Sequence, residues 1–210
     1  MEWEDEMKIK EDNLLTEYNP AEAMSNNVMI EVIQEGPNHP DFEAVLEEYK
    51  DIQFENMKKL GRTNIIQHTI QLLDKQPVSK GNRPLDQKDR IWIKQELKDL
   101  LERGIIREST NPYSAPIVVV DKKTGDRRMC IDYRDLNAKT KKNSYLIPRQ
   151  TEIFASFQGA QWFTSLDLAS GYWQVSIDEK DKEKTAFITP WGLFEWNVMP
   201  FGLCNAPATF

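Results

Sequence analysis

The sequence predicts a fold that mixes α-helices with β-hairpins. Residues 84–104 place apolar side chains at helical spacing, whereas residues 117–133 and 184–198 each hold two strand-like runs separated by a turn. With 210 residues, of which 40% are hydrophobic, the chain has room for one or two domains and a sizeable core.

The helix expected at residues 84–104 has both a start and a stop signal. Pro84-Leu85-Asp86 opens it, and Gly104 closes it. Its buried face is expected to hold four apolar residues, Ile93, Leu97, Leu100 and Leu101. Further helices are predicted at residues 41–60 and 148–157, and residues 207–210 resemble the start of another.

The two hairpins differ in their strands and turns. Residues 117–120 are all apolar, which is typical of a fully buried strand, and Thr124-Gly125 predicts the turn that follows. The second hairpin is expected to pair residues 184–189 with 193–198, around Pro190-Trp191-Gly192.

Charge is distributed unevenly along the chain. Residues 1–60 hold sixteen Asp and Glu against five Lys and Arg, a net charge of −11, whereas residues 61–210 have a net charge of +4. Residues 121–150 hold nine basic and four acidic side chains, which fits either a phosphate-binding surface or a solvated charged face. We expect residues 1–60 to be an acidic linker or helix and residues 61–84 an extended lead-in.

Several classes of site are unlikely from composition. Cys130 and Cys204 lie far apart without a Cys-x-x-Cys motif, which argues against a zinc site or a disulfide framework. His39 and His68 are isolated and are expected to be structural or solvated. No apolar run approaches the roughly 18 residues of a membrane span, and the acidic N-terminus does not resemble a signal peptide, so we expect an intracellular protein that is not secreted.

The stretch from residue 162 to 177 is the part of the sequence around which the functional interpretation is organised. It is expected to form a buried strand, a carboxylate (Asp167) at the strand's end, a turn containing Gly171, and a second, half-buried strand from Tyr172 to Ile177. Asp167 is placed to hold a metal or a polar ligand. It could instead only cap the turn that follows it.

Several blocks in fixed order resemble a known family. They are residues 104–109, 113–120, 128–137, 163–175, 185–187, 191–196 and 199–210. Their sequences, such as Met199-Pro200-Phe201-Gly202-Leu203, resemble the reverse transcriptases of gypsy-class long-terminal-repeat retrotransposons. The resemblance runs from about residue 64 to the end. It implies an α+β fold in which residues 85–210 form the fingers and part of the palm of a right-hand polymerase, with an antiparallel sheet and flanking helices.

The resemblance also implies a chemistry for the Asp167 stretch. Polymerases of this family use two divalent ions, Mg²⁺ or Mn²⁺, held by three palm carboxylates, and Asp167 matches the first of them. The backbone at Leu168 would contact the triphosphate, and Tyr172 matches the aromatic residue that excludes the 2′-hydroxyl of a ribonucleotide.

Other residues match substrate contacts of the family. Arg128 and either Lys122 or Lys123 match the fingers residues that bind the incoming triphosphate, and Phe201 and Gly202 match the loop below the nascent base pair. Nucleic-acid contacts are expected from six further side chains, and for two of these, Arg134 and Asn137, bracing of the fingers is favoured over direct contact. The six are Arg127, Arg134, Asn137, Lys139, Lys141 and Lys142. Arg127 departs from the family, which has Trp at this position.

The remaining two carboxylates of the family lie in a Tyr-x-Asp-Asp hairpin that these 210 residues do not contain. We expect Asp178, Glu179, Asp181 and Glu183 to lie in a charged loop and Glu195 in the second hairpin, so that none replaces the missing pair. The expectation is therefore an RNA-directed DNA polymerase segment, inactive alone, whose two ions require the full-length enzyme.

The implied partners are an RNA or DNA template-primer, deoxynucleoside triphosphates, and the rest of the retroelement polyprotein, namely palm, thumb, RNase H and integrase; no membrane is expected. The implied location is the cytoplasm, in a virus-like particle, or the nucleus. Two alternatives stay open: a non-catalytic nucleic-acid-binding module that uses the basic residues between positions 122 and 142, and a translated remnant without function.

Overall fold

The computed structural model describes residues 44, 47–49, 60–121, 127–161, 163 and 167–210. The chain divides into two compact units, one of residues 1–60 with 159–170 and one of residues 61–158 with 171–210. Both β-sheets belong to the second unit. Most of the helix predicted at residues 41–60, the Thr124-Gly125 turn, and residues 164–166 of the predicted strand lie outside the described residues.

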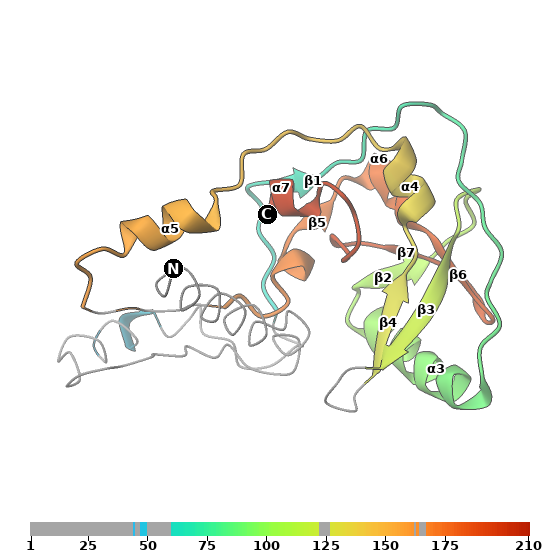
Figure 1. The fold of residues 1–210 in the computed structure, drawn as a ribbon. Coiled ribbons are helices and arrows are strands. Elements are labelled where there is room, and N and C mark those ends of the chain that lie inside the picture. Colours follow the sequence, from blue (N-terminus) through green and yellow to red (C-terminus); the bar gives the residue numbers. More distant parts are fainter. Residues whose placement is uncertain (1–43, 45–46, 50–59, 122–126, 162, 164–166) are drawn as a thin grey trace, which may run out of the picture. The chain divides into compact units, whose positions relative to one another are not determined.

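Five strands form the main sheet, in the order β2-β7-β6-β3-β4 (Figure 1). They are β2 (Ile106–Glu108), β3 (Ala115–Asp121), β4 (Arg127–Ile131), β6 (Phe187–Thr189) and β7 (Gly192–Trp196). The pairs β2–β7, β3–β4 and β6–β7 are antiparallel, whereas β3 and β6 pair in parallel. Both predicted hairpins are present, but the first strand of the second begins at Phe187, since residues 184–185 lie in a 3₁₀ turn. The parallel pairing of β3 with β6 joins the hairpins into one mixed sheet, whereas an antiparallel sheet was expected.

The predicted helix at residues 84–104 is confirmed as α3 (Gln87–Glu102). Asp86 accepts a hydrogen bond from the backbone N–H of Asp89 (2.7 Å), and Gly104 ends the helix with a φ of +63°, a conformation that favours glycine. Ile93, Leu97 and Leu100 are buried as expected, but Leu101 is 36% exposed. A step of one residue turns about 100° around the helix, which carries Leu101 off the buried face.

A cluster of buried aromatic side chains packs against the main sheet in the second unit. Phe187 is fully buried, and its ring lies 5.9 Å from that of Phe194 and 5.8 Å from that of Trp196, which in turn lies 6.0 Å from Trp173. The hydroxyl of buried Tyr133 donates to the carbonyl oxygen of Thr185 (2.7 Å). This bond attaches the end of the first hairpin to the segment that leads into the second.

The apolar run at residues 117–120 is less buried than predicted. Ile117 is fully buried, but Val120 is 47% exposed. The pairing between β3 and β6 ends at Pro116, so the rest of β3 pairs only with β4 and projects beyond the sheet. An all-apolar strand therefore does not require burial along its whole length.

The prediction of a strand from Tyr172 to Ile177 is wrong for the first half of that segment. Gly171–Gln174 form a 3₁₀ turn (η4), and only β5 (Ser176–Ile177) is a strand, paired in parallel with β1 (Gln67–His68). Alternate residues 173, 175 and 177 are buried, as in a half-buried strand. The backbone nevertheless closes on itself, because the N–H of Val175 donates to the carbonyl oxygen of Tyr172 (3.2 Å).

The charged stretch after β5 is not the loop that was expected. It forms α6 (Glu179–Lys182) and a 3₁₀ turn, η5 (Glu183–Thr185). Asp181 is only 2% exposed, since it accepts hydrogen bonds from the backbone N–H of Ile70 (2.8 Å) and from the Lys184 ammonium. The Asp181 carboxylate in this stretch therefore stabilises the fold through buried hydrogen bonds.

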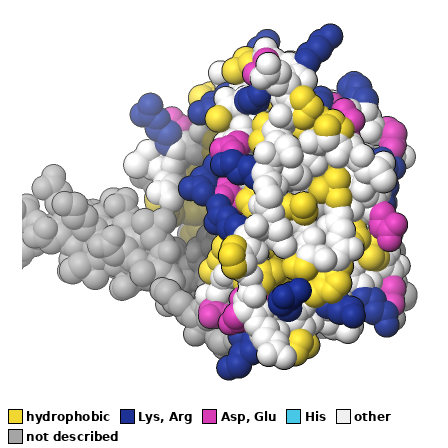
Figure 2. Space-filling model, turned by 90° about the vertical axis from the view of Figure 1, so that its right-hand side faces the viewer, with side chains coloured by type: hydrophobic (Ala, Val, Ile, Leu, Met, Phe, Trp, Pro, Cys, Tyr) yellow, Lys and Arg dark blue, Asp and Glu magenta, His cyan; other side chains and the backbone are white. Residues whose placement is uncertain are grey.

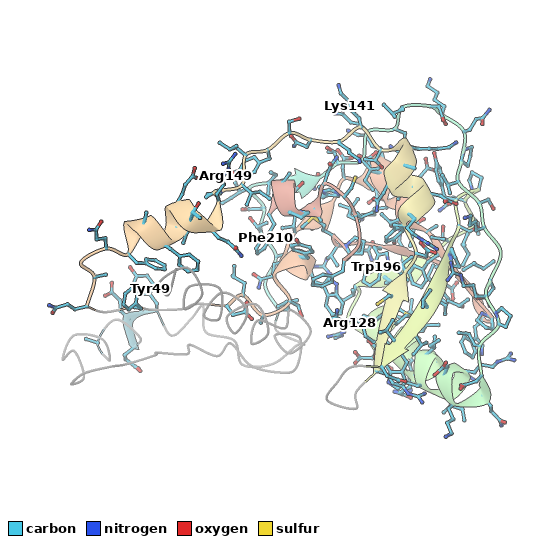
Figure 3. All side chains as sticks on the ribbon, in the orientation of Figure 1. Tyr49, Arg128, Lys141, Arg149, Trp196 and Phe210 are labelled. Carbon is cyan, nitrogen blue, oxygen red and sulfur yellow. The ribbon has the colours of Figure 1, made fainter. Side chains whose placement is uncertain are left out.

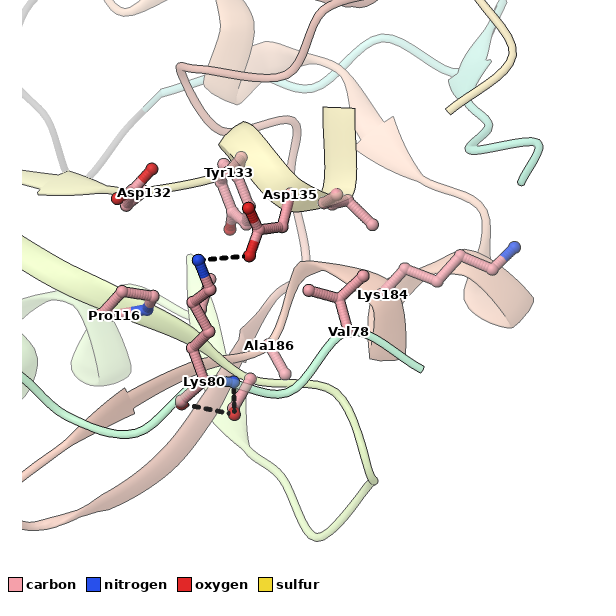
Figure 4. A pocket seen from close by; sticks show the side chains of 11 residues that line it. Val78, Lys80, Pro116, Asp132, Tyr133, Asp135, Lys184 and Ala186 are labelled. Atoms are coloured by element: carbon pink, nitrogen blue, oxygen red, sulfur yellow. Dashed lines mark hydrogen bonds and ion pairs between the residues drawn. The ribbon is translucent and has the colours of Figure 1, made fainter. Parts of the chain in front are cut away.

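The lead-in segment (residues 61–84) is extended, as predicted, and crosses the second unit. Besides β1 it forms single bridges between Leu72 and Thr140 and between Ser79 and Ser114. Lys80 makes an ion pair with Asp135 (2.5 Å) beside a cavity of about 10 Å³, which has room for at most one water molecule (Figure 4). The lead-in segment is thus closely packed here.

Three short helices complete the second unit: α4 (Arg134–Lys139), α5 (Gln150–Ser156) and α7 (Ala206–Thr209). The helices predicted at residues 148–157 and at the end of the chain are confirmed as α5 and α7. None of the helices in the described part of the chain is long and apolar enough to cross a membrane.

Candidate functional site

Asp167 and Leu168 lie in the first unit, in backbone that is neither helical nor a strand. Asp167 is half-buried and Leu168 is 56% exposed. Ser170 follows with a φ of +46°, which is uncommon for a residue other than glycine and marks a sharp turn of the chain. A carboxylate and main-chain oxygens at such a turn are the hard donors that Mg²⁺ prefers.

Among the described residues, no group of three or more His, Cys, Asp or Glu side chains is arranged to hold a metal ion. The role of Asp167 as a metal ligand stays a prediction.

Three aromatic side chains form a cluster in the second unit. The ring of Tyr172 stacks on that of Phe201, with centroids 4.8 Å apart and planes 25° from parallel. Phe210 meets Tyr172 edge-on at 5.2 Å and 63°. These are the favoured geometries of aromatic pairs, and Tyr172 is held from two sides. Tyr172 and Phe201 were predicted separately, from different motifs, and the structure places them in contact.

The loop at residues 199–205 carries Phe201 and is fixed by Asn137 of α4. The Asn137 amide donates to the carbonyl oxygen of Gly202 (2.7 Å) and accepts from the N–H of Cys204 (2.9 Å). Gly202 has a φ of +94°, and a Cβ there would lie 3.5 Å from the Tyr133 ring and 3.6 Å from the Ile131 carbonyl oxygen. Asn137 therefore braces this loop, using both ends of its side chain.

The predicted triphosphate contacts lie on the hairpin β3–β4. Arg128 is half-buried on β4, whereas Lys122 and Lys123 lie outside the described residues (Figure 3). Arg127 makes ion pairs with Asp89 of α3 (2.8 Å) and with Asp121 (3.5 Å). The pair with Asp89 attaches the hairpin to α3, whereas Asp121 lies on the neighbouring strand β3. A phosphate that reached Arg127 would compete with both carboxylates.

The other predicted basic contacts differ in their surroundings. Arg134 is highly exposed and holds Asp132 through two bonds of 2.8 and 2.7 Å, and Arg83 binds the same carboxylate. The hydrogen bonds from Arg134 and the charge of Arg83 hold the pKa of Asp132 far below its usual value. Two arginines thus share one carboxylate, leaving a net positive charge at the surface.

Lys139 is the last residue of α4, and Lys141 and Lys142 follow the helix. Lys139 pairs with Asp74 (3.1 Å), whereas Lys141 and Lys142 are exposed (Figure 3). On the face shown in Figure 2, basic side chains lie next to acidic ones, with hydrophobic side chains between them. This face is therefore mixed in charge rather than uniformly basic.

Sequence reasoning missed two buried polar networks and one aromatic residue. Glu195, 5% exposed, accepts hydrogen bonds from Arg107 (2.7 Å), Ser109 (2.6 Å) and Asn111 (2.7 Å). Arg107 and Glu195 are direct partners in the register of β2 and β7, a signal that needs the strand pairing to be known. The second network surrounds His68. Phe210 was quoted within a motif but was given no role.

Comparisons with known proteins agree with this geometry. Residues 120–210 match the family described as reverse transcriptase (RNA-dependent DNA polymerase). The chain is 38% identical over 172 residues to the retrovirus-related Pol polyprotein from transposon 297 of Drosophila melanogaster, and 38% identical over 181 residues to that from transposon gypsy of the same organism. Each match covers 80% of this chain, but the chain spans only 16% and 18% of the two relatives.

A solved structure shows the same fold. The crystal structure of the prototype foamy virus protease-reverse transcriptase (CSH mutant) matches 80% of this chain and 23% of its own, with a TM-score of 0.70 and 26% identity. Residues 120–210 therefore form part of a reverse transcriptase (RNA-dependent DNA polymerase) domain, and the two Drosophila relatives support a gypsy-class retrotransposon Pol polyprotein as its context.

Proposed function

We propose that this chain forms the nucleotide-binding side of an RNA-directed DNA polymerase. The observation that supports it most directly is the stacking of the Tyr172 ring on that of Phe201. Phe201 lies on a loop to which the Asn137 amide makes two hydrogen bonds. A ring fixed in this way can exclude a 2′-hydroxyl sterically, because moving the packed side chain to make room would cost free energy. The substrates are deoxynucleoside triphosphates and an RNA or DNA template-primer.

Each predicted site residue has a part in this proposal. Asp167 supplies one carboxylate ligand, the Leu168 backbone contacts the triphosphate, and Arg128 binds its phosphates with Lys122 or Lys123. Two divalent ions, Mg²⁺ or Mn²⁺, supply activation of the primer hydroxyl and neutralisation of the leaving pyrophosphate when bound. A foamy viral protease-reverse transcriptase of this fold has been solved in complex with an RNA/DNA hybrid, which supports a template-primer as the partner.

The 210-residue chain by itself is not expected to polymerise, because one carboxylate cannot hold two ions. The experiment is primer extension on an RNA template, with the 210-residue chain and with a longer Pol segment that includes a Tyr-x-Asp-Asp motif. Extension is expected only from the longer segment. Asp167→Asn in that segment should abolish extension and leave template-primer binding within about two-fold, since a neutral isostere keeps the fold. Full extension by Asp167→Asn would overturn the proposal.

A second candidate is nucleic-acid binding without catalysis, favoured by the exposed side chains of Arg134, Lys141 and Lys142. If phosphate contacts dominate, the affinity of the 210-residue chain for a hybrid duplex falls steeply with salt, and Lys141→Glu with Lys142→Glu weakens it further. Asp167→Asn serves as the matched control, because it should leave this affinity unchanged. Affinity that does not depend on salt would exclude this candidate.

A further inference from the structure

His68 is a buried imidazole at the junction of the lead-in segment and the end of the chain. It is 1% exposed, although it belongs to β1, a strand of only two residues. Its carbonyl oxygen accepts from the N–H of Asp178 (3.0 Å), and β1 pairs with β5. Its ring faces α7, which lies beside β1 (Figure 1).

One hydrogen bond joins the His68 ring to α7. His68 Nδ1 lies 2.8 Å from the hydroxyl oxygen of Thr209. That hydroxyl can also donate to the carbonyl oxygen of Asn205 (3.3 Å). In the His68–Thr209 bond, Nδ1 is the donor or the acceptor according to the tautomer of the ring.

Burial and the charged groups around His68 act in opposite directions on its pKa. Asp181 lies close enough to favour the imidazolium, but its two carboxylate oxygens already accept from Ile70 and Lys184. Asp178, the other acidic residue at this junction, pairs with Lys180 (2.9 Å). Burial outweighs the effect of Asp181 and lowers the pKa of His68 below its usual value.

The position of α7 bears directly on the aromatic cluster. Phe210 follows Thr209, and its ring contacts Tyr172 at 5.2 Å. Side-chain contacts from outside α7 help to hold it in place. The bond from His68 is one such contact. Another is Asn205 at its start, whose amide bonds to the backbone of Lys141 (2.9 Å) and Asn143 (2.9 Å).

We propose that His68 is a positioning residue for the deoxynucleotide site. Through Thr209 it fixes α7, and α7 holds Phe210 against the edge of Tyr172, so that the Tyr172 ring keeps the place from which it excludes ribonucleotides. This inference rests on the proposed function. It assigns a role to a histidine that lies more than 100 residues from Tyr172 in the sequence.

Two pairs of variants test the link in the longer Pol segment. His68→Leu and Thr209→Val remove the bond, whereas His68→Asn keeps an N–H near the position of Nδ1 and Thr209→Ser keeps the hydroxyl. Both removals should raise the KM for deoxynucleotides and reduce discrimination against ribonucleotides by about five-fold, as expected for one hydrogen bond of ordinary net strength. Both conservative variants should retain most of the selectivity. The double variant His68→Leu/Thr209→Val should be no worse than either alone.

Selectivity that is unchanged in both removal variants would overturn the inference. If His68→Leu does not fold, Thr209→Val against Thr209→Ser decides alone. The unsubstituted segment and Asp167→Asn are measured in parallel, so that failure of the proposed function itself is seen separately. Amide exchange of Phe210 in the 210-residue chain gives a readout without catalysis: it should become faster in Thr209→Val but not in Thr209→Ser, and equal rates would also refute the link.

Discussion

The ring of Tyr172 lies 4.8 Å from the ring of Phe201 and nearly parallel to it, although 28 residues separate them in the sequence. The contact joins the 3₁₀ turn that follows Gly171 to the loop that Asn137 fixes. Neither motif alone specifies a nucleotide pocket. Their contact limits the positions that the Tyr172 ring can occupy, which is what the proposed nucleotide site requires.

Removal of the Tyr172 ring should relax sugar selection in the longer Pol segment. Tyr172→Ala is expected to raise the efficiency of ribonucleotide incorporation at least ten-fold, which corresponds to about 1.4 kcal/mol. Phe201→Leu should have a smaller effect in the same direction, because it keeps apolar bulk but loses the stack. The measurement is kcat/KM for paired deoxy- and ribonucleotides. Unchanged selectivity in Tyr172→Ala would show that another residue excludes the 2′-hydroxyl.

Loss of the Asn137 amide should loosen the loop at residues 199–205. Asn137→Ala removes the bonds to Gly202 and Cys204 and is expected to lower the free energy of unfolding by about 1–3 kcal/mol. Asn137→Asp keeps the acceptor for Cys204 but loses the donor to Gly202, so its loss should be intermediate. Urea denaturation measures both. Equal stability of all three proteins would contradict a bracing role.

Replacement of the buried carboxylate of Glu195 by an apolar side chain should strongly lower the free energy of unfolding. Glu195→Leu leaves Arg107, Ser109 and Asn111 without their acceptor, and we expect a loss of about 3–5 kcal/mol. Glu179 provides a matched control, since it binds the same arginine (2.7 Å) but is exposed. Glu179→Gln should cost less than about 1 kcal/mol. A similar loss in both variants would argue against burial as the cause.

His68 predicts a pH dependence of stability. Its folded pKa lies below the unfolded value of 6.5, so the unfolded chain binds a proton in weak acid that the folded chain does not. Stability attributable to His68 is therefore complete above pH 6.5 and is lost as the pH falls below it, at up to about 1.4 kcal/mol per pH unit. The difference in Tm between the unsubstituted protein and His68→Leu should shrink from pH 7.5 to 5.5. A constant difference would mean that His68 binds the proton in the folded state.

Local signals in the sequence were sufficient for most of the elements. The cap at Asp86 and the stop at Gly104 bound α3 correctly, since both act through the backbone of adjacent residues. The same signals failed for Tyr172 to Gln174. Alternating burial is common to a strand and to this 3₁₀ turn, and only the hydrogen bond from Val175 back to Tyr172 separates them.

Long-range pairing explains what the sequence could not indicate. The amide of Asn137 acts on a loop more than 60 residues away, and Glu195 finds its donors across β2 and β7. His68 was expected to be merely structural or solvated, because its partner Thr209 is 141 residues distant. The positions of Asp167, Tyr172 and Phe201 came from a family resemblance, and periodicity alone would have left them as turn and packing residues.

The order of strands in the main sheet affects how the chain can fold during synthesis. β2 ends at residue 108 but pairs only with β7, and β3 meets β6 only after more than 60 further residues. During synthesis on a ribosome, α3 and the first hairpin emerge early. The edge of β3 that pairs with β6 stays unpaired until residues 187–189 have emerged. Pairings of such long range are slow, and the unpaired edges are open to aggregation in the interval. A pause in translation before residue 196 would therefore prolong the vulnerable state, whereas one placed after it would not.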